Sequence, residues 1–160
     1  MESDTQAHPQ TKKDYADSVF FYERKHYELS NFSSHAVEID GVIYLTSEHA
    51  YQCMKFDDQA VRNKIIEAKS AFLSKQVSRE HNHLAREDWN SIKVGVMESV
   101  LRSKLAQHED VRDSLIRTGS KAIYENSPTD LFWGCGTDMS GENHLGKIWM
   151  KIRDEASDSK

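Results

Sequence analysis

Trp89-Asn-Ser-Ile-Lys-Val-Gly-Val-Met-Glu-Ser-Val-Leu-Arg-Ser-Lys-Leu105 is one long amphipathic segment. Its large apolar side chains recur at intervals of three and four residues, at Trp89, Ile92, Val96, Val100, Leu101 and Leu105. This spacing places them on one face of a single α-helix. We expect that helix to be the central packing element of the fold.

Shorter helical patterns lie on both sides of this segment. We expect helices over 47–56, 60–69, 109–117 and 143–153, and a further short one around 71–76. Thr46 or Ser47 is a suitable N-cap for the first of these helices. Gly119 suits the left-handed residue that ends the helix at 117.

The strand signals are fewer. Residues 19–22 and 121–124 are expected strands, and a hairpin is expected around Asp40-Gly41. A two-residue turn there puts Val37, Ile39, Val42 and Tyr44 on one face. Helices therefore predominate, and the sequence predicts a single helix-rich α+β domain with a small β-sheet. We expect this domain to span 18–155, between a flexible N-terminal tail, 1–17, and a frayed C-terminus, 156–160.

Composition narrows the class of protein. The 160 residues are 38% hydrophobic and 29% charged, which excludes disordered and collagen-like chains. A net charge of -5 argues against sequence-blind adhesion to nucleic acid but permits a local basic groove. Cys53 and Cys135 lack a CxxC partner and are expected to be free thiols in an intracellular protein, cytoplasmic, or nuclear in a eukaryote. No apolar run is long enough to suggest association with a membrane.

The expected helix over 47–56 carries the first candidate site. One stripe of that helix holds Glu48, Tyr51, Gln52 and Lys55, an array of acid, phenol, amide and amine. The pattern fits a solvated helix face with a weak charge pair. It also fits a functional array, because Glu48 lies in the first turn, where the helix dipole stabilises a carboxylate.

The segment 133–146 carries the second candidate, since it holds four of the seven glycines and ends at an expected helix start. Such a segment can hold a phosphate on its backbone N–H groups, or it can be an ordinary connection with turns. Trp89 is similarly open to two interpretations, core packing or stacking on a base.

The eight histidines and the serines follow no known metal-ligand or nucleophile motif. No HExxH motif, no histidine–cysteine pair at ligand spacing and no GxSxG motif occurs. The sequence therefore predicts no metal site, no cofactor and no Ser/His/Asp arrangement.

Five groups of residues together resemble the NADAR family, also called YbiA-like, in unbroken order from about residue 20 to 153. They are Ser30-Asn31-Phe32; Thr46-Ser47-Glu48-His49 with Tyr51-Gln52 and Lys55-Phe56; Trp89 with Lys93 and Met97; Phe132-Trp133-Gly134-Cys135-Gly136; and Asn143 with Leu145-Gly146 and Met150. The resemblance implies a helix-rich α+β fold and hydrolysis of N-glycosidic bonds on ribose. Cys135 stands where some bacterial members carry an acid.

The resemblance also implies roles for individual residues. Glu48, Lys55 and Asp130 would be catalytic. The substrate pocket would be formed by Asn31, Phe32, Tyr51, Gln52, Trp89, Trp133, Gly134, Asn143 and Gly146. The favoured substrate is ADP-ribose attached to guanine of DNA or RNA, and the alternative is a phosphoribosylamino-pyrimidine intermediate of riboflavin biosynthesis. A third reading is a non-enzymatic module that binds ADP-ribose or NAD. No obligate protein partner is expected.

Two mechanisms fit these residues. A glycosylamine on an exocyclic nitrogen can open to an imine, so the Lys55 amine could displace the base and form a Schiff base, with Glu48 moving protons. Alternatively, a carboxylate stabilises an oxocarbenium ion and water attacks directly.

Overall fold

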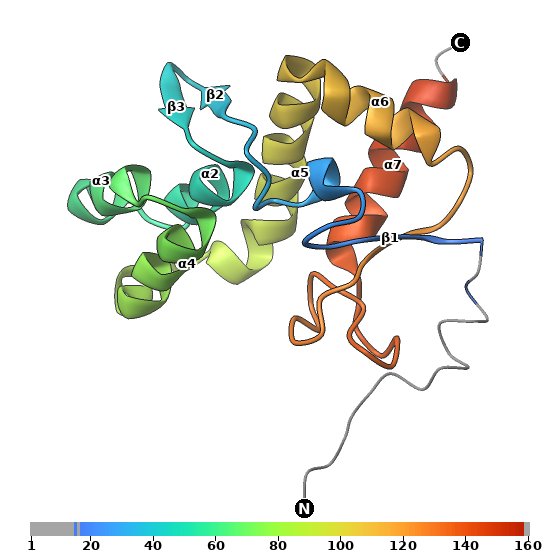
Figure 1. Ribbon diagram of the computed structural model, residues 1–160. Coiled ribbons are helices and arrows are strands. Elements are labelled where there is room, and N and C mark those ends of the chain that lie inside the picture. Colours follow the sequence, from blue (N-terminus) through green and yellow to red (C-terminus); the bar gives the residue numbers. More distant parts are fainter. Residues whose placement is uncertain (1–14, 16, 159–160) are drawn as a thin grey trace, which may run out of the picture. The chain divides into compact units, whose positions relative to one another are not determined.

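The computed structural model describes residue 15 and residues 17–158 (Figure 1). Within these residues it has six α-helices, two short 3-10 helices, Tyr27–Leu29 and Asn82–Leu84, and four strands, which confirms the α+β class. The described chain forms two compact units. One is Asn31–Arg112, and the other combines the described parts of Met1–Ser30 and Asp113–Lys160. This division lies inside the segment 18–155 that the sequence analysis treats as one domain.

The predicted hairpin is present in the unit Asn31–Arg112. Strand β2 (Val37–Ile39) pairs antiparallel with β3 (Val42–Tyr44), and Val37 lies opposite Tyr44. Asp40 and Gly41 both have positive φ, 51° and 79°. These values are what a two-residue turn matching the strand twist requires, and they explain the Asp-Gly pair.

Four helices follow in the same unit, and side chains cap three of them. They are α2 (Ser47–Met54), α3 (Gln59–Glu67), α4 (Ala71–Glu80) and α5 (Trp89–Gln107). Thr46, Asp58 and Ser70 each accept a hydrogen bond from a backbone N–H in the first turn of the helix that follows. Helix α4 is longer than the predicted 71–76.

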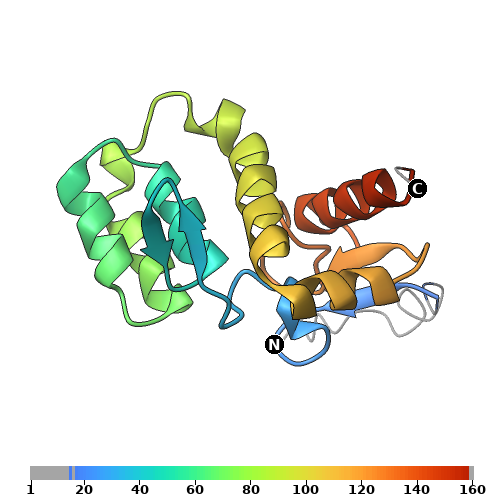
Figure 2. The ribbon, with the colours of Figure 1, turned by 90° about the horizontal axis from the view of Figure 1, so that it is seen from above.

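The core of this unit forms where α2, α3 and α5 meet the hairpin (Figure 2). Its buried members are Tyr44, Ala50, Cys53, Phe56, Val61, Ile65 and Val100. Helix α5 buries Trp89, Met97, Val100 and Leu101, so the predicted central helix is confirmed as a packing element. It also buries Lys104 completely, which the apolar pattern does not predict.

The other unit contains a parallel strand pair, β1 (Val19–Phe21) with β4 (Ile123–Glu125). Helix α7 (His144–Asp158) packs on β4. Helix α6 (Glu109–Arg117) begins in the unit Asn31–Arg112, enters this unit at Asp113 and ends before Gly119, whose φ is 61°. The small sheet expected from the sequence is therefore two separate two-stranded sheets.

The structure describes only part of the two predicted terminal segments. Helix α7 continues through 156–158, part of the segment expected to fray. Most of the predicted N-terminal tail lies outside the described residues, apart from Tyr15 and Asp17. Among the residues that the structure describes, no helix is both long and apolar enough to cross a membrane.

Candidate active site

The start of α2 is fixed by a buried histidine. The Nε2 atom of His49 lies 3.0 Å from the carbonyl oxygen of Ala68, and its Nδ1 atom lies 2.8 Å from Oγ1 of Thr46. A carbonyl only accepts, so Nε2 carries the proton and Nδ1 accepts from the threonine hydroxyl. Burial lowers the pKa of His49, which keeps the ring neutral in this role. His49 therefore positions α2 and is not a proton donor to substrate.

Asn31 lies at the same helix end. Ser47 Oγ donates to Asn31 Oδ1 at 3.0 Å, and the backbone N–H of Glu48 donates to the Asn31 carbonyl at 3.2 Å. The Asn31 amide in turn lies 3.2 Å from the sulfur of Met97 on α5. The residue predicted to shape the pocket thus holds Glu48 in place.

Glu48 is buried, with 6% of its surface exposed, and so are Tyr51 and Gln52. The interpretation of this stripe as a solvated face is therefore wrong for these three residues. Gln52 Nε2 donates to Glu48 Oε1 at 2.8 Å. A carboxylate taken out of water needs such donors, and its place in the first turn of α2 adds the favourable helix dipole.

Lys55 follows α2 directly and is half-buried. Its Nζ atom donates to Ser78 Oγ on α4 at 3.2 Å. Burial, and then the neighbouring cations Lys93 and Arg79, lower the pKa of Lys55. A lowered pKa increases the fraction of neutral amine, the form that attacks carbon.

Glu48 and Lys55 share one face of the chain at opposite ends of α2. They are seven positions apart, which is about 10 Å of rise along a helix axis. Gln52, hydrogen-bonded to Glu48, lies between them in the same stripe.

Trp89 packs against Tyr51, with ring centroids 5.1 Å apart and planes tilted by 48°. Only 8% of Trp89 is exposed, so the structure favours the packing interpretation. Phe32, in contrast, is 38% exposed and can contact a ligand.

The remaining predicted residues lie in the other unit. Asp130 Oδ1 accepts from the backbone N–H groups of Phe132 and Trp133, at 3.0 and 2.8 Å. This carboxylate oxygen therefore stabilises the turn that leads to Trp133. Trp133 is half-buried and packs edge-on against Phe132 at 4.9 Å.

Asn143, Gly134 and Gly146 serve the fold of this unit. The Asn143 side chain donates to the Ile123 carbonyl and accepts from the N–H of Glu125, both at 2.9 Å. A Cβ at Gly134 would lie 2.8 Å from the Asp130 carbonyl oxygen, and one at Gly146 would collide with the Ile123 carbonyl oxygen. Their residue types are thus explained by close packing.

The suggested phosphate cradle in 133–146 is not supported by the hydrogen bonds of this segment. Seven backbone N–H groups of the segment donate to carbonyl oxygens of the same unit. The donors are Gly134, Cys135, Gly141, Glu142, Asn143, His144 and Leu145. The first two N–H groups of α7, those of His144 and Leu145, therefore already donate to the carbonyls of Phe132 and Trp133. The ordinary-connection interpretation fits this part of the segment better.

Sequence reasoning missed two sets of polar contacts. Ser78, the partner of Lys55, is a buried serine within a helix and gives no local signal. Ser33, His35 and Asp110 form a hydrogen-bonded chain although no motif predicts it. Ser33 is fully buried, so its hydroxyl is not accessible as a nucleophile.

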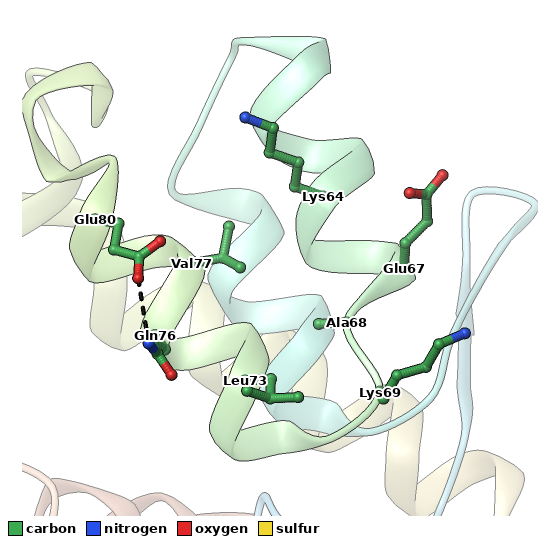
Figure 3. Close-up of a pocket in the computed structure, with 8 residues that line it drawn as sticks. All are labelled: Lys64, Glu67, Ala68, Lys69, Leu73, Gln76, Val77 and Glu80. Carbon is green, nitrogen blue, oxygen red and sulfur yellow. Dashed lines mark hydrogen bonds between the residues drawn. The ribbon is translucent and has the colours of Figure 1, made fainter.

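A surface groove of about 370 Å³ lies between α3 and α4 (Figure 3). Its lining includes Lys64, Glu67, Lys69 and Leu73, and the charged ends do not converge on one point. None of the predicted site residues lines it. The groove therefore does not compete with α2 as the candidate site.

Comparison with known proteins identifies the family. The NADAR domain model matches residues 20–156. The chain is 36% identical over 143 residues to N-glycosidase Npun_R5314 of Nostoc punctiforme, covering 86% of this chain and 92% of that protein. It is 33% identical over 128 residues to N-glycosidase YbiA of Escherichia coli, covering 80% of each.

Two further matches extend this result. Riboflavin biosynthesis protein VVA0006 of Vibrio vulnificus is 37% identical over 139 residues, covering 86% of this chain, which spans only 38% of that protein's length. The NMR structure of E. coli YbiA matches with a TM-score of 0.79 and 30% identity, covering 89% of this chain and 87% of that one. Sequence and fold agree, and the chain belongs to the NADAR domain family.

Proposed function

We propose that the chain hydrolyses the N-glycosidic bond between the anomeric carbon of a ribose and an exocyclic amine. The observation that carries the proposal is the pair at the two ends of α2: a buried carboxylate, Glu48, in the first turn, and a half-buried amine, Lys55, directly after the helix, whose pKa is lowered. The names of the Nostoc and E. coli relatives, both N-glycosidases, support the same reaction class.

Lys55 is the proposed nucleophile. The glycosylamine first opens, so that its anomeric carbon becomes an imine bonded to the base nitrogen. The neutral Nζ atom adds to this carbon, and the bond from carbon to the base nitrogen then breaks as that nitrogen takes up a proton. The remaining Schiff base adds water, releases the Nζ atom, and leaves a ribose aldehyde that recloses.

Glu48 is the proposed proton carrier for these steps. As a carboxylate it accepts the proton that Nζ loses on addition, and as an acid it returns a proton to the leaving amine. In the oxocarbenium alternative, Glu48 or Asp130 instead stabilises the cationic ribose, and Lys55 only binds a hydroxyl or phosphate. Its lowered pKa favours the nucleophilic role, because a binding cation gains nothing from being neutral.

ADP-ribosylated guanine is the proposed substrate. Lys93 and Arg79 are near enough to lower the pKa of Lys55, and such a group of basic side chains suits a pyrophosphate. Cys135 is buried, so it influences substrate choice only through the shape of its loop. The name of the Vibrio relative keeps the phosphoribosylamino-pyrimidine as the second candidate.

The direct test is turnover of an oligonucleotide carrying ADP-ribose on guanine, followed by mass spectrometry. Release of ADP-ribose with restored guanine supports the proposal. Cleavage of only the phosphoribosylamino-pyrimidine replaces the substrate but keeps the reaction class. Binding without release of either product means that the chain is a reader and overturns the enzymatic proposal.

Borohydride trapping tests the role of Lys55. Reduction during turnover should attach the ribose fragment to the peptide containing Lys55. The adduct should be absent in Lys55→Arg, because arginine keeps the charge but has no amine that can lose its proton. Lys64→Arg, at an exposed lysine of α3, is the matched control and should keep the adduct. Near-normal turnover in Lys55→Arg without any adduct would favour the oxocarbenium path.

A further inference from the structure

We propose that His35, His108 and Asp110 form a binding site for one divalent transition metal ion, for which Zn²⁺ is the best match. The sequence predicts no such site, because the residues follow no ligand motif and His35 is 75 positions from Asp110. All three lie in the unit Asn31–Arg112 and none belongs to the proposed catalytic set.

The three side chains already converge. His35 Nε2 lies 2.6 Å from Asp110 Oδ2, and the two imidazole rings meet edge to face with centroids 4.9 Å apart. One ligand atom from each residue lies within 4.8 Å of the other two. Zinc bonds of about 2.0–2.1 Å bring tetrahedral ligand atoms to about 3.4 Å from one another, so side-chain rotations that shorten the present separations by up to about 1.4 Å complete the set.

Neighbouring acceptors orient both rings for this role. His108 Nε2 lies 2.5 Å from the Ala36 carbonyl, which only accepts, so Nε2 carries the proton and Nδ1 keeps its lone pair. His35 Nδ1 lies 2.7 Å from Ser33 Oγ, a hydroxyl that can also accept. When a metal replaces the proton on His35 Nε2, Nδ1 donates to Ser33. Such partners of the second ring nitrogen are typical of histidines that bind metal.

The third ligand is suited by charge and access. The Asp110 carboxylate already accepts a hydrogen bond from the imidazole of His35 at 2.6 Å. The Asp110 side chain is 61% exposed, which leaves a path for the ion and room for water as a fourth ligand. Histidine nitrogen with carboxylate oxygen is a donor set that zinc accepts.

Nearby positive charge limits the affinity. Buried Lys104 donates from Nζ to Ser33 Oγ at 2.8 Å, one hydrogen bond from His35. Asp110 also lies in the first turn of α6, where the helix dipole disfavours a cation. We therefore expect a weaker site than a closed zinc centre.

The bound ion would tie the segment before β2 to the junction of α5 and α6. Because it binds the folded chain, it should raise the melting temperature with increasing concentration. This effect is separate from glycosidase activity, so the site and the proposed function can fail independently.

The test is calorimetric titration of Zn²⁺ alone into the full chain, previously treated with EDTA and dialysed, together with thermal unfolding. We expect one saturable site and a rise in melting temperature. His108→Gln and Asp110→Asn should each weaken binding by at least about tenfold. His83→Gln is the matched control, because His81 and His83 form another imidazole pair, with centroids 6.4 Å apart.

Three results would overturn the site: no saturable binding by the wild-type chain, unchanged binding in both ligand variants, or loss of binding in His83→Gln alone. Circular dichroism of the metal-free variants shows whether each one folds. Asp110→Asn changes an exposed side chain, so it keeps the test decisive even where His108→Gln unfolds. Imidazole nitrogen chemical shifts of His35 and His108 should move with Zn²⁺ in the wild-type chain, and unmoved shifts contradict ligation directly.

Discussion

Replacing Trp89 by alanine separates packing from ligand stacking at the start of α5. Trp89 is 8% exposed and its ring packs on Tyr51. Removing a buried tryptophan side chain costs about 3–5 kcal/mol. For a chain of this size each kcal/mol lowers the melting temperature by about 2–4 °C, so Trp89→Ala should melt about 6–20 °C below wild type.

The assay combines thermal and urea unfolding by circular dichroism with steady-state kinetics. Phe72→Ala is the control, because Phe72 is 62% exposed and its loss should cost less than about 0.5 kcal/mol. An unchanged urea m-value confirms that the same structure unfolds. A melting temperature within about 2 °C of wild type, together with a raised KM, would refute the packing role and favour stacking on the substrate.

Four further changes test separate parts of the mechanism and the fold. Glu48→Gln should lower turnover about 10²-fold or more while circular dichroism shows a folded chain; an unchanged rate removes Glu48 from the chemistry. Lys93→Met removes a cation that lowers the pKa of Lys55, so the rise of kcat on the acid side of its pH profile should move to higher pH. An unchanged pH profile would contradict the requirement for a neutral Lys55 amine. EDTA should leave turnover unchanged, since no step uses a metal; loss restored by one divalent ion would refute this. Gly146→Ala should lower the free energy of unfolding in urea by roughly 3 kcal/mol, because the added Cβ collides with the Ile123 carbonyl oxygen. Its control, Gly95→Ala, has open space around the added Cβ in α5 and should raise that free energy by about 0.5–1 kcal/mol. Equal effects of the two substitutions would contradict the packing argument.

The local elements could be predicted from the sequence because their signals are local. The Asp40-Gly41 turn and the Thr46 cap each depend on a few adjacent residues, and both are confirmed. Helix α4 was predicted too short because it ends in polar residues. One of these, Ser78, is buried and accepts a hydrogen bond from Lys55, which no local pattern reveals. The parallel pairing of β1 with β4 joins distant segments and has no local signal either.

The sequence predicts which residues of the candidate site share one helix face, but it does not predict whether that face is buried or exposed. Helical spacing places Glu48, Tyr51 and Gln52 together, yet a solvated face fits that spacing equally well. Burial decides between the two readings, and it comes from neighbours elsewhere in the unit, such as Trp89 against Tyr51. The cluster of His35, His108 and Asp110 was missed for the same reason.

The residues that carry the family resemblance divide into two kinds when their contacts are considered. The side-chain amide of Asn143 donates one hydrogen bond to β4 and accepts another from it. Gly146 lies too close to the Ile123 carbonyl oxygen for any side chain. The fold alone therefore accounts for both residues. Glu48 and Lys55 differ, because burying a carboxylate and desolvating an amine both oppose folding. The lowered pKa of Lys55 means that the folded chain binds this proton less well than the unfolded chain does. The free energy of unfolding that Lys55 contributes therefore decreases as the pH falls. Packing alone gives no reason to bury these two groups, whereas a nucleophile and a proton carrier work best when they are partly removed from water. The chemistry is therefore best sought at α2.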